Sequence, residues 1–306
     1  MNNYLAISLG VLCAGLGGEL FVRGAVGIAR WARIPAGIIG VTIAAFATSS
    51  PELSVAATAA LAGAPQISLG DALGSNVVNI SLILALVLLM SGIQTSAEMI
   101  KRDFSFALLT PVIIGLLAFD GQLSRMDGVI LLIVFTGWLS TVVIGALGHR
   151  KASGEALAAA GDGQAIFIGV IGIVLLIAAG RLIVIGAKGL AAVWGMDEFI
   201  VGATVVAVAT GTPEIATTIV ANWRGHHDLG LGNLLGSNIF NGLLIVAIAA
   251  IIAPITIVWN EVAVGLFFGI LTTLIVFPFR GEVIGCKRGI FLLAVYGLYL
   301  VLILQI

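Results

Sequence analysis

The chain has 306 residues, of which 60% are hydrophobic and only 9% are charged, and its formal net charge at pH 7 is −1. Soluble domains carry about 25% charged residues, so this composition and the mean hydropathy of +1.20 exclude a soluble globular protein and indicate a polytopic membrane protein. Cys13 and Cys286 stand alone in apolar sequence, which argues against a disulfide framework or a metal–thiolate site. The start, Met1-Asn2-Asn3, lacks the basic residues of a signal peptide, so the first apolar run is expected to be a retained span.

Apolar runs separated by short polar breaks predict an all-α fold with ten transmembrane helices of roughly 20 residues each. The predicted spans cover residues 4–28, 36–62, 67–92, 104–119, 127–147, 165–192, 199–221, 229–252, 261–279 and 287–305. The longest connection, residues 149–164, is rich in Ala, Gly and charged residues and is expected to be a flexible linker. No connection is long enough to fold as a soluble catalytic or regulatory domain.

The distribution of Lys and Arg predicts the orientation of the chain. Ten of the 14 basic residues follow odd-numbered spans: Arg30, Arg33, Lys101, Arg102, Arg150, Lys151, Arg224, Arg280, Lys287 and Arg288. Because cytoplasmic loops are enriched in basic residues, we expect the linker in the cytoplasm and both termini outside it. The small size without inserted domains indicates the plasma (inner) membrane of a prokaryote.

The sequence repeats itself without a gap at one constant offset, the repeat shift, which takes Glu52 to Glu214. The first matched set pairs Gly40, Thr42, Ala45, Ala47, Thr48, Pro51 and Glu52 with Gly202, Thr204, Ala207, Ala209, Thr210, Pro213 and Glu214. The second set pairs Gly70, Leu73, Gly74, Ser75, Asn76 and Asn79 with Gly232, Leu235, Gly236, Ser237, Asn238 and Asn241.

An odd number of spans, five, separates the equivalent segments, so the two copies enter the membrane from opposite sides. The sequence therefore predicts a 5+5 inverted-topology repeat whose ligand site lies near the midplane, where the halves meet. The first repeat is expected over residues 1–148 with its motif at 40–82, the linker over 149–164, and the second repeat over 165–306 with its motif at 202–244.

Each repeat places a carboxylate and a proline that is expected to break the helix in the middle of an apolar span. Thr48 and Glu52 are four residues apart, as are Thr210 and Glu214, so each pair shares one helical face. A carboxylate near the bilayer midplane costs roughly 2.5–3.5 kcal/mol on insertion scales. The prolines cannot donate a backbone hydrogen bond, so carbonyls within 45–48 and 207–210 are expected to be free to coordinate a cation.

The following span of each repeat carries a polar stripe on an otherwise apolar helix. Asp71, Ser75 and Asn79 form the first stripe, and Asn233, Ser237 and Asn241 form the second. Asp71 lies about 12 Å along the helix from Asn79 at a rise of about 1.5 Å per residue. We therefore expect Asp71 near a helix start or in a vestibule rather than among the ion ligands.

The predicted site offers only hard oxygen ligands, namely carboxylates, hydroxyls, amides and carbonyls. Calcium prefers such ligands, whereas magnesium dehydrates reluctantly and zinc prefers nitrogen or sulfur. Sodium shares the oxygen preference, and two neighbouring carboxylates repel each other, so protons are expected to compete as well. An empty site would carry about −2, and a carrier that reorients only when this charge is neutralised must exchange one cation for another.

The paired Thr-x-x-Pro-Glu and Gly-Ser-Asn-x-x-Asn segments resemble the alpha repeats of sodium/calcium exchangers, in the cation/calcium antiporter superfamily. The resemblance covers nearly the whole chain, including the ten predicted spans. It implies that Glu52 and Glu214 are the central metal ligands and that spans one and six slide across the other eight. The other metal ligands that it implies are the hydroxyls of Thr48, Ser49, Ser75, Thr210 and Ser237, the carbonyls of Ala45 and Ala207, and the amides of Asn79 and Asn241.

Three positions depart from the family pattern. Asn241 stands where related exchangers often have Asp, Gly211 replaces a serine, and Arg181 stands where an acidic residue is common. Asn241 leaves the counter-ion and the stoichiometry open. Arg181 is expected either to pair with an acidic residue or to extend to the membrane interface.

The expected function is a secondary antiporter that exchanges Na⁺ for Ca²⁺, and the alternative is an H⁺- or K⁺-coupled calcium or cation antiporter of the same superfamily. A channel is disfavoured because midplane carboxylates in inverted repeats suit a carrier. An intramembrane lipid-phosphate hydrolase would need a cluster of Arg, Ser or His to hold phosphate, so an enzyme is not expected. Ca²⁺ and Na⁺ are expected as transported ions in a lipid membrane, with no cofactor, partner protein or nucleic acid implied.

Overall fold

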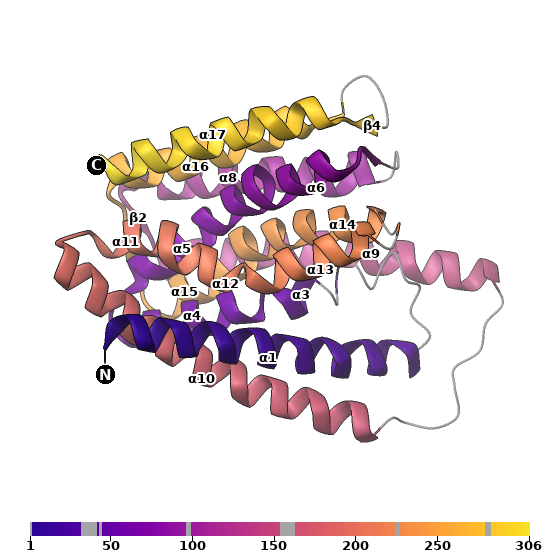
Figure 1. Cartoon of the computed structure of the whole chain (residues 1–306), viewed down its shortest axis with the longest axis horizontal. Helices are drawn as coiled ribbons and strands as arrows, with labels where there is room; N and C mark the ends of the chain where they lie inside the picture. The colour runs from indigo at the N-terminus through magenta and orange to yellow at the C-terminus, as the bar shows by residue number, and fades with distance from the viewer. Residues whose placement is uncertain are drawn as a thin grey trace.

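The computed structural model describes residues 2–31, 42, 45–95, 99–153, 163–223, 225, 227–278 and 283–306, and it is built mainly of helices (Figure 1). The elements before residue 154 are α1 (Asn3–Trp31), α3 (Ala45–Thr48), α4 (Ser50–Leu61), α5 (Pro65–Val78), η2 (Asn79–Leu84), α6 (Ala85–Met90), β1 (Ile93–Gln94), η3 (Ile100–Phe104), α8 (Ser105–Leu117), η4 (Ala118–Asp120), β2 (Gln122–Leu123) and α9 (Arg125–Ser153). Those after residue 162 are α10 (Gly163–Trp194), α11 (Glu198–Val201), η5 (Gly202–Val206), α12 (Ala207–Thr210), α13 (Thr212–Trp223), α14 (His227–Ile239), η6 (Phe240–Ile245), α15 (Val246–Ile252), β3 (Ile255–Thr256), α16 (Trp259–Val276), β4 (Val283–Ile284) and α17 (Cys286–Leu304).

Within the described residues, seven helices are long and apolar enough to cross a membrane, and the bent pair Glu198–Thr210 and Thr212–Trp223 would make an eighth. These eight coincide with eight of the ten predicted spans. The remaining two are the 29-residue helix α1 and the predicted span 36–62, which includes residues 36–41, 43 and 44 outside the described part. The count of ten is therefore not confirmed. Residues 154–162 of the predicted linker also lie outside the described part, and α9 continues to Ser153, past the predicted linker start at 149.

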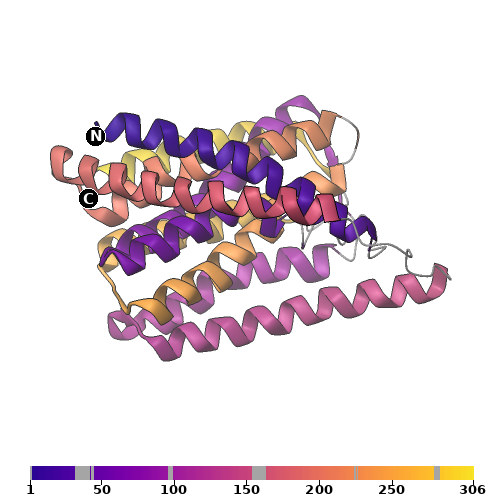
Figure 2. The ribbon, with the colours of Figure 1, turned by 90° about the horizontal axis from the view of Figure 1, so that it is seen from below.

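The two chain ends lie at the same end of the molecule (Figure 1), and the view from below agrees (Figure 2). The end of α9 and the beginning of α10 lie at the opposite end, as do the end of α1 and the beginning of α17. The predicted basic clusters follow or flank these helix ends, although Arg33, Arg224 and Arg280 lie outside the described residues. This arrangement fits an even number of membrane crossings.

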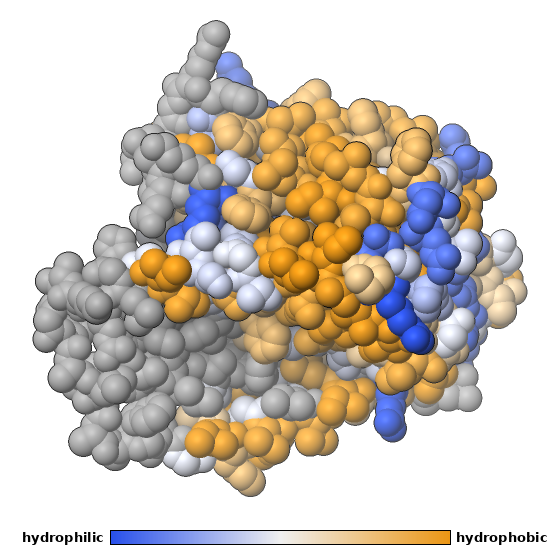
Figure 3. Space-filling view, turned by 180° about the vertical axis from the view of Figure 1, so that it is seen from behind, coloured by the Kyte–Doolittle hydropathy of each residue, from blue (hydrophilic) through white to orange (hydrophobic). Residues whose placement is uncertain are grey.

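The core lies along the two equivalent helices that carry the polar stripes. The most apolar windows of Pro65–Met90 and Gly230–Ile252 are both 78% buried, whereas that of Cys286–Leu304 is only 28% buried. On the outside, large apolar side chains such as Leu116, Ile133 and Phe167 are exposed. Figure 3 shows apolar residues over the middle of one face and hydrophilic residues toward one side of it. A buried polar stripe inside an apolar exterior is the arrangement expected of a chain that surrounds an ion site in lipid.

Glycines bring the first stripe helix against the second half of the chain. A Cβ atom at Gly70 would overlap the carbonyl oxygen of Phe199, and one at Gly74 would overlap that of Ala203. Gly202 makes the reciprocal approach, because its Cβ would meet the Ile67 carbonyl. Close backbone contact through small residues is how membrane helices gain van der Waals energy. It places the stripe of α5 directly beside η5 and α12.

The helices α1 and α10 pack against each other in antiparallel directions through further glycines. Gly10 lies beside Ile183, Gly17 beside Leu175, and Gly24 beside Gly169, so residue numbers rise along one helix as they fall along the other. In Figures 1 and 2 these two helices lie side by side along one flank of the molecule. Their order agrees with halves that run in opposite directions.

Two short antiparallel ribbons join the halves at opposite ends of the molecule (Figure 1). β1 pairs with β4, aligning Ile93 with Ile284, and β2 pairs with β3, aligning Leu123 with Ile255. The repeat shift converts β1 into β3 and brings β2 within one residue of β4. The second ribbon is thus nearly the symmetry copy of the first, and the ribbons follow the repeat seen in the sequence.

We predict that Gly74→Ala destabilises the protein, whereas Gly137→Ala does not. Alanine in a helix is favoured over glycine by roughly 0.5–1 kcal/mol, so both changes gain the same helix propensity. A Cβ at Gly137 meets nothing within 4 Å, but one at Gly74 overlaps the Ala203 backbone, and overpacking costs about 1–3 kcal/mol. Thermal unfolding of the two purified variants in detergent measures the difference. An equal rise in melting temperature for both would show that α5 does not need this close approach.

Candidate ion-binding site

Glu52 and Glu214 lie in the interior, each in the first turn of a helix that follows a break. Ser49 interrupts the path between α3 and α4, and Gly211 interrupts it between α12 and α13, at equivalent positions of the repeat. Pro51 and Pro213 fall in the first turn of the new helix, where a missing N–H costs nothing. The predicted proline breaks are confirmed.

The two glutamates lie among contacts that join the halves. Each has only 1% of its surface exposed. The Ser49 hydroxyl, from the first half, donates to Oε1 of Glu214 at 3.5 Å, and the Ser237 hydroxyl donates to the same oxygen at 3.4 Å. The negative charges of Glu52 and Glu214 repel each other, and each carboxylate lies at the amino-terminal end of its helix, where the helix dipole favours an anion.

Two threonines make matching contacts across the halves. The Thr48 hydroxyl donates to Oδ1 of Asn233 at 3.2 Å, and the Thr210 hydroxyl donates to Oδ1 of Asp71 at 3.1 Å. The repeat shift converts one pair into the other. Thr48 also lies 3.3 Å from the Ser237 hydroxyl. Each half therefore supplies a hydroxyl to the stripe of the other half.

A pair of asparagines ties the two stripe helices together. The Asn76 amide donates to the Asn238 carbonyl at 3.1 Å, and the Asn238 amide donates to the Asn76 carbonyl at 3.2 Å. The repeat shift takes one of these residues to the other, so this contact is its own symmetry copy. The Asn79 amide also donates to Oδ1 of Asn238 at 3.0 Å. Sequence reasoning noted both asparagines in the repeated Gly-Ser-Asn motif but gave them no role, because the crossing of α5 and α14 is not visible in the sequence.

Several buried polar atoms of the site have no hydrogen-bond partner among the described residues. They are Oε2 of Glu52 and of Glu214, Oδ2 of Asp71, Oδ1 of Asn76 and Asn79, and both amide atoms of Asn241. Roughly 90% or more of buried polar groups in proteins are paired, so such a cluster indicates a place where an ion or water completes the contacts. In the described part of the chain these three carboxylates form no ion pair with Lys, Arg or His. The site therefore attracts cations.

The carboxylates of the described residues are too few at any one point to form the whole ligand shell of a metal ion. Among the described residues, no three Asp, Glu, His or Cys side chains converge closely enough to hold a metal ion. A cation bound here must take hydroxyl, amide or carbonyl oxygens in addition to the carboxylates. Such a mixed oxygen shell is typical of calcium and sodium rather than of zinc.

The structure brings together most of the residues predicted to be metal ligands. Thr48, Ser49, Ser237 and Glu214 form one contiguous group, and Thr210 lies within hydrogen-bonding reach of Glu52. Asn79 and Asn241 are fully buried, each at or next to the start of a π-helical turn, η2 or η6. Ser75 is turned toward Asp71 instead of Glu52, because its hydroxyl donates to Oδ1 of Asp71 at 3.3 Å. Their roles as ligands stay predictions.

The carbonyls of Ala45 and Ala207 are not free, contrary to the sequence prediction. Ala45 accepts the Ser49 N–H at 2.9 Å, and Ala207 accepts the Gly211 N–H at 3.1 Å. A proline removes the bond to the carbonyl four residues earlier, which is Ala47 or Ala209. Each carbonyl oxygen has two lone pairs, so the Ala207 carbonyl keeps one for a cation. The Ala45 carbonyl also accepts the Thr48 hydroxyl at 3.3 Å, so both of its lone pairs are engaged.

Asp71 is not at a helix start or in a vestibule, and that prediction was wrong. It is the seventh residue of α5, its exposure is 0%, and it contacts Thr210 of the other half. The distance along one helix misled the prediction, because the broken helix of the second half crosses α5 and meets Asp71 there.

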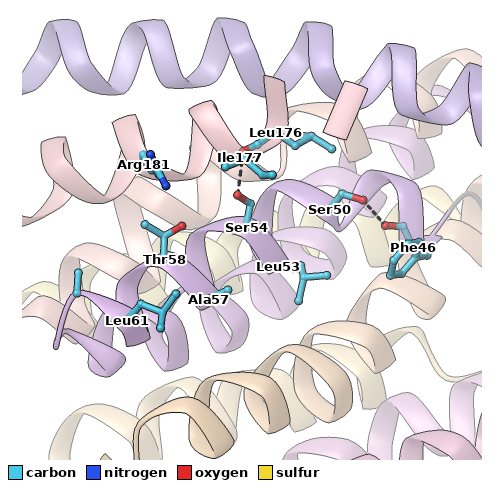
Figure 4. A pocket seen from close by; sticks show the side chains of 11 residues that line it. Phe46, Ser50, Leu53, Ser54, Ala57, Thr58, Leu61, Leu176, Ile177 and Arg181 are labelled. Atoms are coloured by element: carbon cyan, nitrogen blue, oxygen red, sulfur yellow. Dashed lines mark hydrogen bonds between the residues drawn. The ribbon is translucent and has the colours of Figure 1, made fainter. Parts of the chain in front are cut away.

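A separate cavity of about 680 Å³ lies between α4 and α10 (Figure 4). It is lined mainly by apolar side chains, together with Ser50, Ser54 and Thr58 of α4 and Arg181 of α10. Ser50 donates to the Phe46 carbonyl and Ser54 to the Leu176 carbonyl, so both hydroxyls are satisfied locally. Arg181 is exposed at this cavity and forms no ion pair with any described residue. No predicted ligand lines the cavity, which is therefore distinct from the ion site.

Comparison with known proteins shows the family to which the chain is related. Residues 3–144 and 164–305 match the family described as "Sodium/calcium exchanger protein". The chain is 36% identical over 245 residues to "Putative antiporter CaxA" of Alkalimonas amylolytica, a match covering 77% of this chain and 76% of that protein. It is 26% identical over 352 residues to "Sodium/calcium exchanger MaX1" of Methanosarcina acetivorans, covering 99% of both.

The fold matches solved structures of the sodium-calcium exchanger NCX_Mj. One of them, soaked with Na⁺ and Sr²⁺, superimposes with a TM-score of 0.70 at 28% sequence identity and covers 98% of each chain. Family and fold both belong to transporters rather than enzymes, and the apolar helices make the chain a multi-pass membrane protein. The chain is a cation/calcium antiporter and belongs to the sodium/calcium exchanger family.

Proposed function

We propose that the chain is a secondary active antiporter that exchanges Na⁺ for Ca²⁺ at a site built around Glu52 and Glu214. The observation that carries the proposal is the burial of two carboxylates from different halves, each with one oxygen that lacks a hydrogen-bond partner in the described part of the chain. In the described residues no basic side chain neutralises them, so a cation or a proton must. The relative MaX1 is named a sodium/calcium exchanger, and NCX_Mj was soaked with Na⁺ and Sr²⁺.

Glu52 and Glu214 would be the central ligands, with hydroxyl, amide and carbonyl oxygens around them. Thr48, Ser49, Thr210 and Ser237 lie within hydrogen-bonding distance of one glutamate or of each other. The predicted ligands completing the set are Ser75, Asn79, Asn241 and the carbonyls of Ala45 and Ala207. The charge of the site would then control its movement, because the vacant site is too negative to change sides and the loaded site is not.

Alternating access would arise from two oppositely oriented five-helix repeats, which give ten spans in total. The antiparallel pair of α1 and α10 is joined through Gly10, Gly17 and Gly24, and small residues leave a smooth surface. This pair is the element that would move against the stripe helices. Both termini would lie outside the cytoplasm at the plasma (inner) membrane, on the side shared by the two chain ends in Figure 1.

We predict that Glu52→Gln and Glu214→Gln each abolish calcium uptake driven by a sodium gradient, because glutamine keeps the side-chain shape but removes the charge that holds the cation. Calcium uptake into sodium-loaded proteoliposomes measures this. The matched control is Glu19→Gln, which changes an exposed carboxylate paired with Arg23 on α1 and should leave uptake intact. Wild-type uptake by either buried variant would contradict the assigned site.

Calcium uptake into the same proteoliposomes also identifies the counter-ion. Replacing internal sodium by potassium, or by a proton gradient, should give little calcium uptake if sodium is the coupling ion. Full uptake on potassium or protons alone would instead support the H⁺- or K⁺-coupled alternative.

We predict that Ser49→Ala weakens apparent calcium affinity about 2- to 10-fold, whereas Ser50→Ala leaves it unchanged. The Ser49 hydroxyl points to Glu214, and a hydrogen bond to a buried group contributes about 0.5–1.5 kcal/mol. The neighbouring Ser50 hydroxyl donates back to the Phe46 carbonyl and faces the separate cavity (Figure 4). Calcium concentration curves for uptake measure both affinities. Equal effects from the two substitutions would place the contribution in the backbone break rather than in the hydroxyl.

A further inference from the structure

The cavity between α4 and α10 holds a positive charge without a partner in the described part of the chain. Figure 4 shows Arg181 pointing from α10 into the cavity, toward Thr58 of α4. Its guanidinium forms no ion pair or hydrogen bond with any described residue. A cationic side chain in the middle of an apolar, 32-residue helix is costly in lipid unless an anion or water meets it.

The first half shows how the equivalent position is neutralised when the chain supplies the partner. The repeat shift takes Glu19 of α1 to Arg181, and it takes Arg23 to Ile185. Glu19 and Arg23 form an ion pair at 2.7 Å, whereas one turn after Arg181 the chain offers only the apolar Ile185. Among the described residues, the charge of Arg181 is therefore left for an anion from outside the chain.

Lys188 places a second positive charge on the same face of α10. It follows Arg181 by two helical turns, which is about 10 Å along the helix. Its Nζ donates to the carbonyl of Ala62, which lines the cavity at the end of α4, at 3.2 Å. Tyr4 and Trp194, with ring centroids 6.4 Å apart, lie at this end of α1 and α10, as interfacial aromatics do. The two cations thus extend from inside the cavity toward the membrane surface.

The rest of the cavity is apolar and has about the length of one membrane leaflet. Leu61, Ala57 and Leu53 line it from the end of α4 back toward Phe46 (Figure 4). The 12 residues of α4 extend about 18 Å, and half of a hydrocarbon core is roughly 15 Å thick. Its volume of about 680 Å³ lies within the roughly 300–1,000 Å³ of typical ligand sites.

Two other uses of the cavity fit less well. The charge of Arg181 repels Ca²⁺ and Na⁺, which argues against a path for these ions. A free inorganic anion would pair with Arg181 but would leave the apolar part of the cavity unfilled. An apolar chain with an anionic head matches both parts.

We propose that the cavity between α4 and α10 binds one anionic phospholipid, whose phosphate lies between Arg181 and Lys188 and whose acyl chain lies along α4 toward Phe46. Arginine binds phosphate through two parallel hydrogen bonds, and basic pockets between membrane helices hold anionic headgroups. A zwitterionic phospholipid carries its own positive charge beside the phosphate, so the two cations hold it less tightly.

The test measures lipid binding to the purified protein in detergent by native mass spectrometry, so its outcome does not depend on transport. The probes are phosphatidylglycerol, phosphatidylcholine with the same acyl chains, and inorganic phosphate. We expect one phosphatidylglycerol to bind about 10-fold more tightly than phosphatidylcholine, because hydrogen bonds to charged groups are strong. Arg181→Gln should remove this preference and Lys188→Gln should reduce it. The matched control Arg23→Gln changes an arginine of α1 that is already paired, and it should keep the preference.

Equal binding of the two lipids by the wild-type protein, or an unchanged preference in Arg181→Gln, would overturn the proposal. Complete displacement of phosphatidylglycerol by an equal concentration of inorganic phosphate would also overturn it, because the site would then bind a free anion. If Arg181→Gln does not fold, Ala57→Phe decides. The larger side chain fills the apolar part of the cavity and should prevent binding, whereas undiminished binding would show that the lipid lies elsewhere.

Discussion

The structure depends on keeping carboxylates in a low-dielectric interior without basic partners. Effective desolvation costs are several kcal/mol per buried ion, so the vacant state is held at high free energy. An arginine beside Glu52 or Glu214 would remove that cost, but it would also remove the reason to bind a cation. Arg181, a basic residue in the middle of α10, instead opens onto the separate cavity and stays out of the ion site. Among the described residues, the carboxylates of the site have no basic partner, so their charge is left for a cation or a proton to neutralise.

The contacts between the two halves occur at equivalent positions of the repeat, but the residue types at some of these positions differ. Thr48 with Asn233 repeats as Thr210 with Asp71, and Asn76 with Asn238 repeats onto itself. Ser49, however, donates to Glu214, whereas its counterpart Gly211 has no side chain to offer Glu52. The Glu214 side therefore has one more hydroxyl, and the Glu52 side has one more carboxylate. In the proposed alternating-access mechanism, two halves of nearly equal shape would exchange roles between inward and outward states, while their different ligands would bind different ions.

Much of the fold and of the candidate site could be predicted from the sequence, because the repeat shows the same pattern of residues in both halves. The repeat shift, the breaks ahead of Pro51 and Pro213, and the meeting of the two halves around Glu52 and Glu214 follow from residue types and spacing. The contact of Asp71 with Thr210 and the Asn76–Asn238 pair could not be predicted in that way. Both depend on where α5 crosses the second half, and helical periodicity describes one helix at a time. The crossing is set by Gly70 and Gly74, whose neighbours only the structure reveals.

The helix breaks explain how the site can be both buried and anionic. Because α4 and α13 each begin one residue after a break, Glu52 and Glu214 fall in the first turn of a 12-residue helix. An anion there gains about 0.3–1 kcal/mol from the helix dipole, and up to about 2 kcal/mol when partly buried. This is less than the desolvation cost of a carboxylate, so the dipole eases ionisation without satisfying the charge. An unbroken helix would place both carboxylates beside mid-helix backbone, whose N–H groups are already paired, and the cost of an empty site would rise. In the proposed exchange, the break would therefore keep the site at a strength at which a cation binds and can still leave.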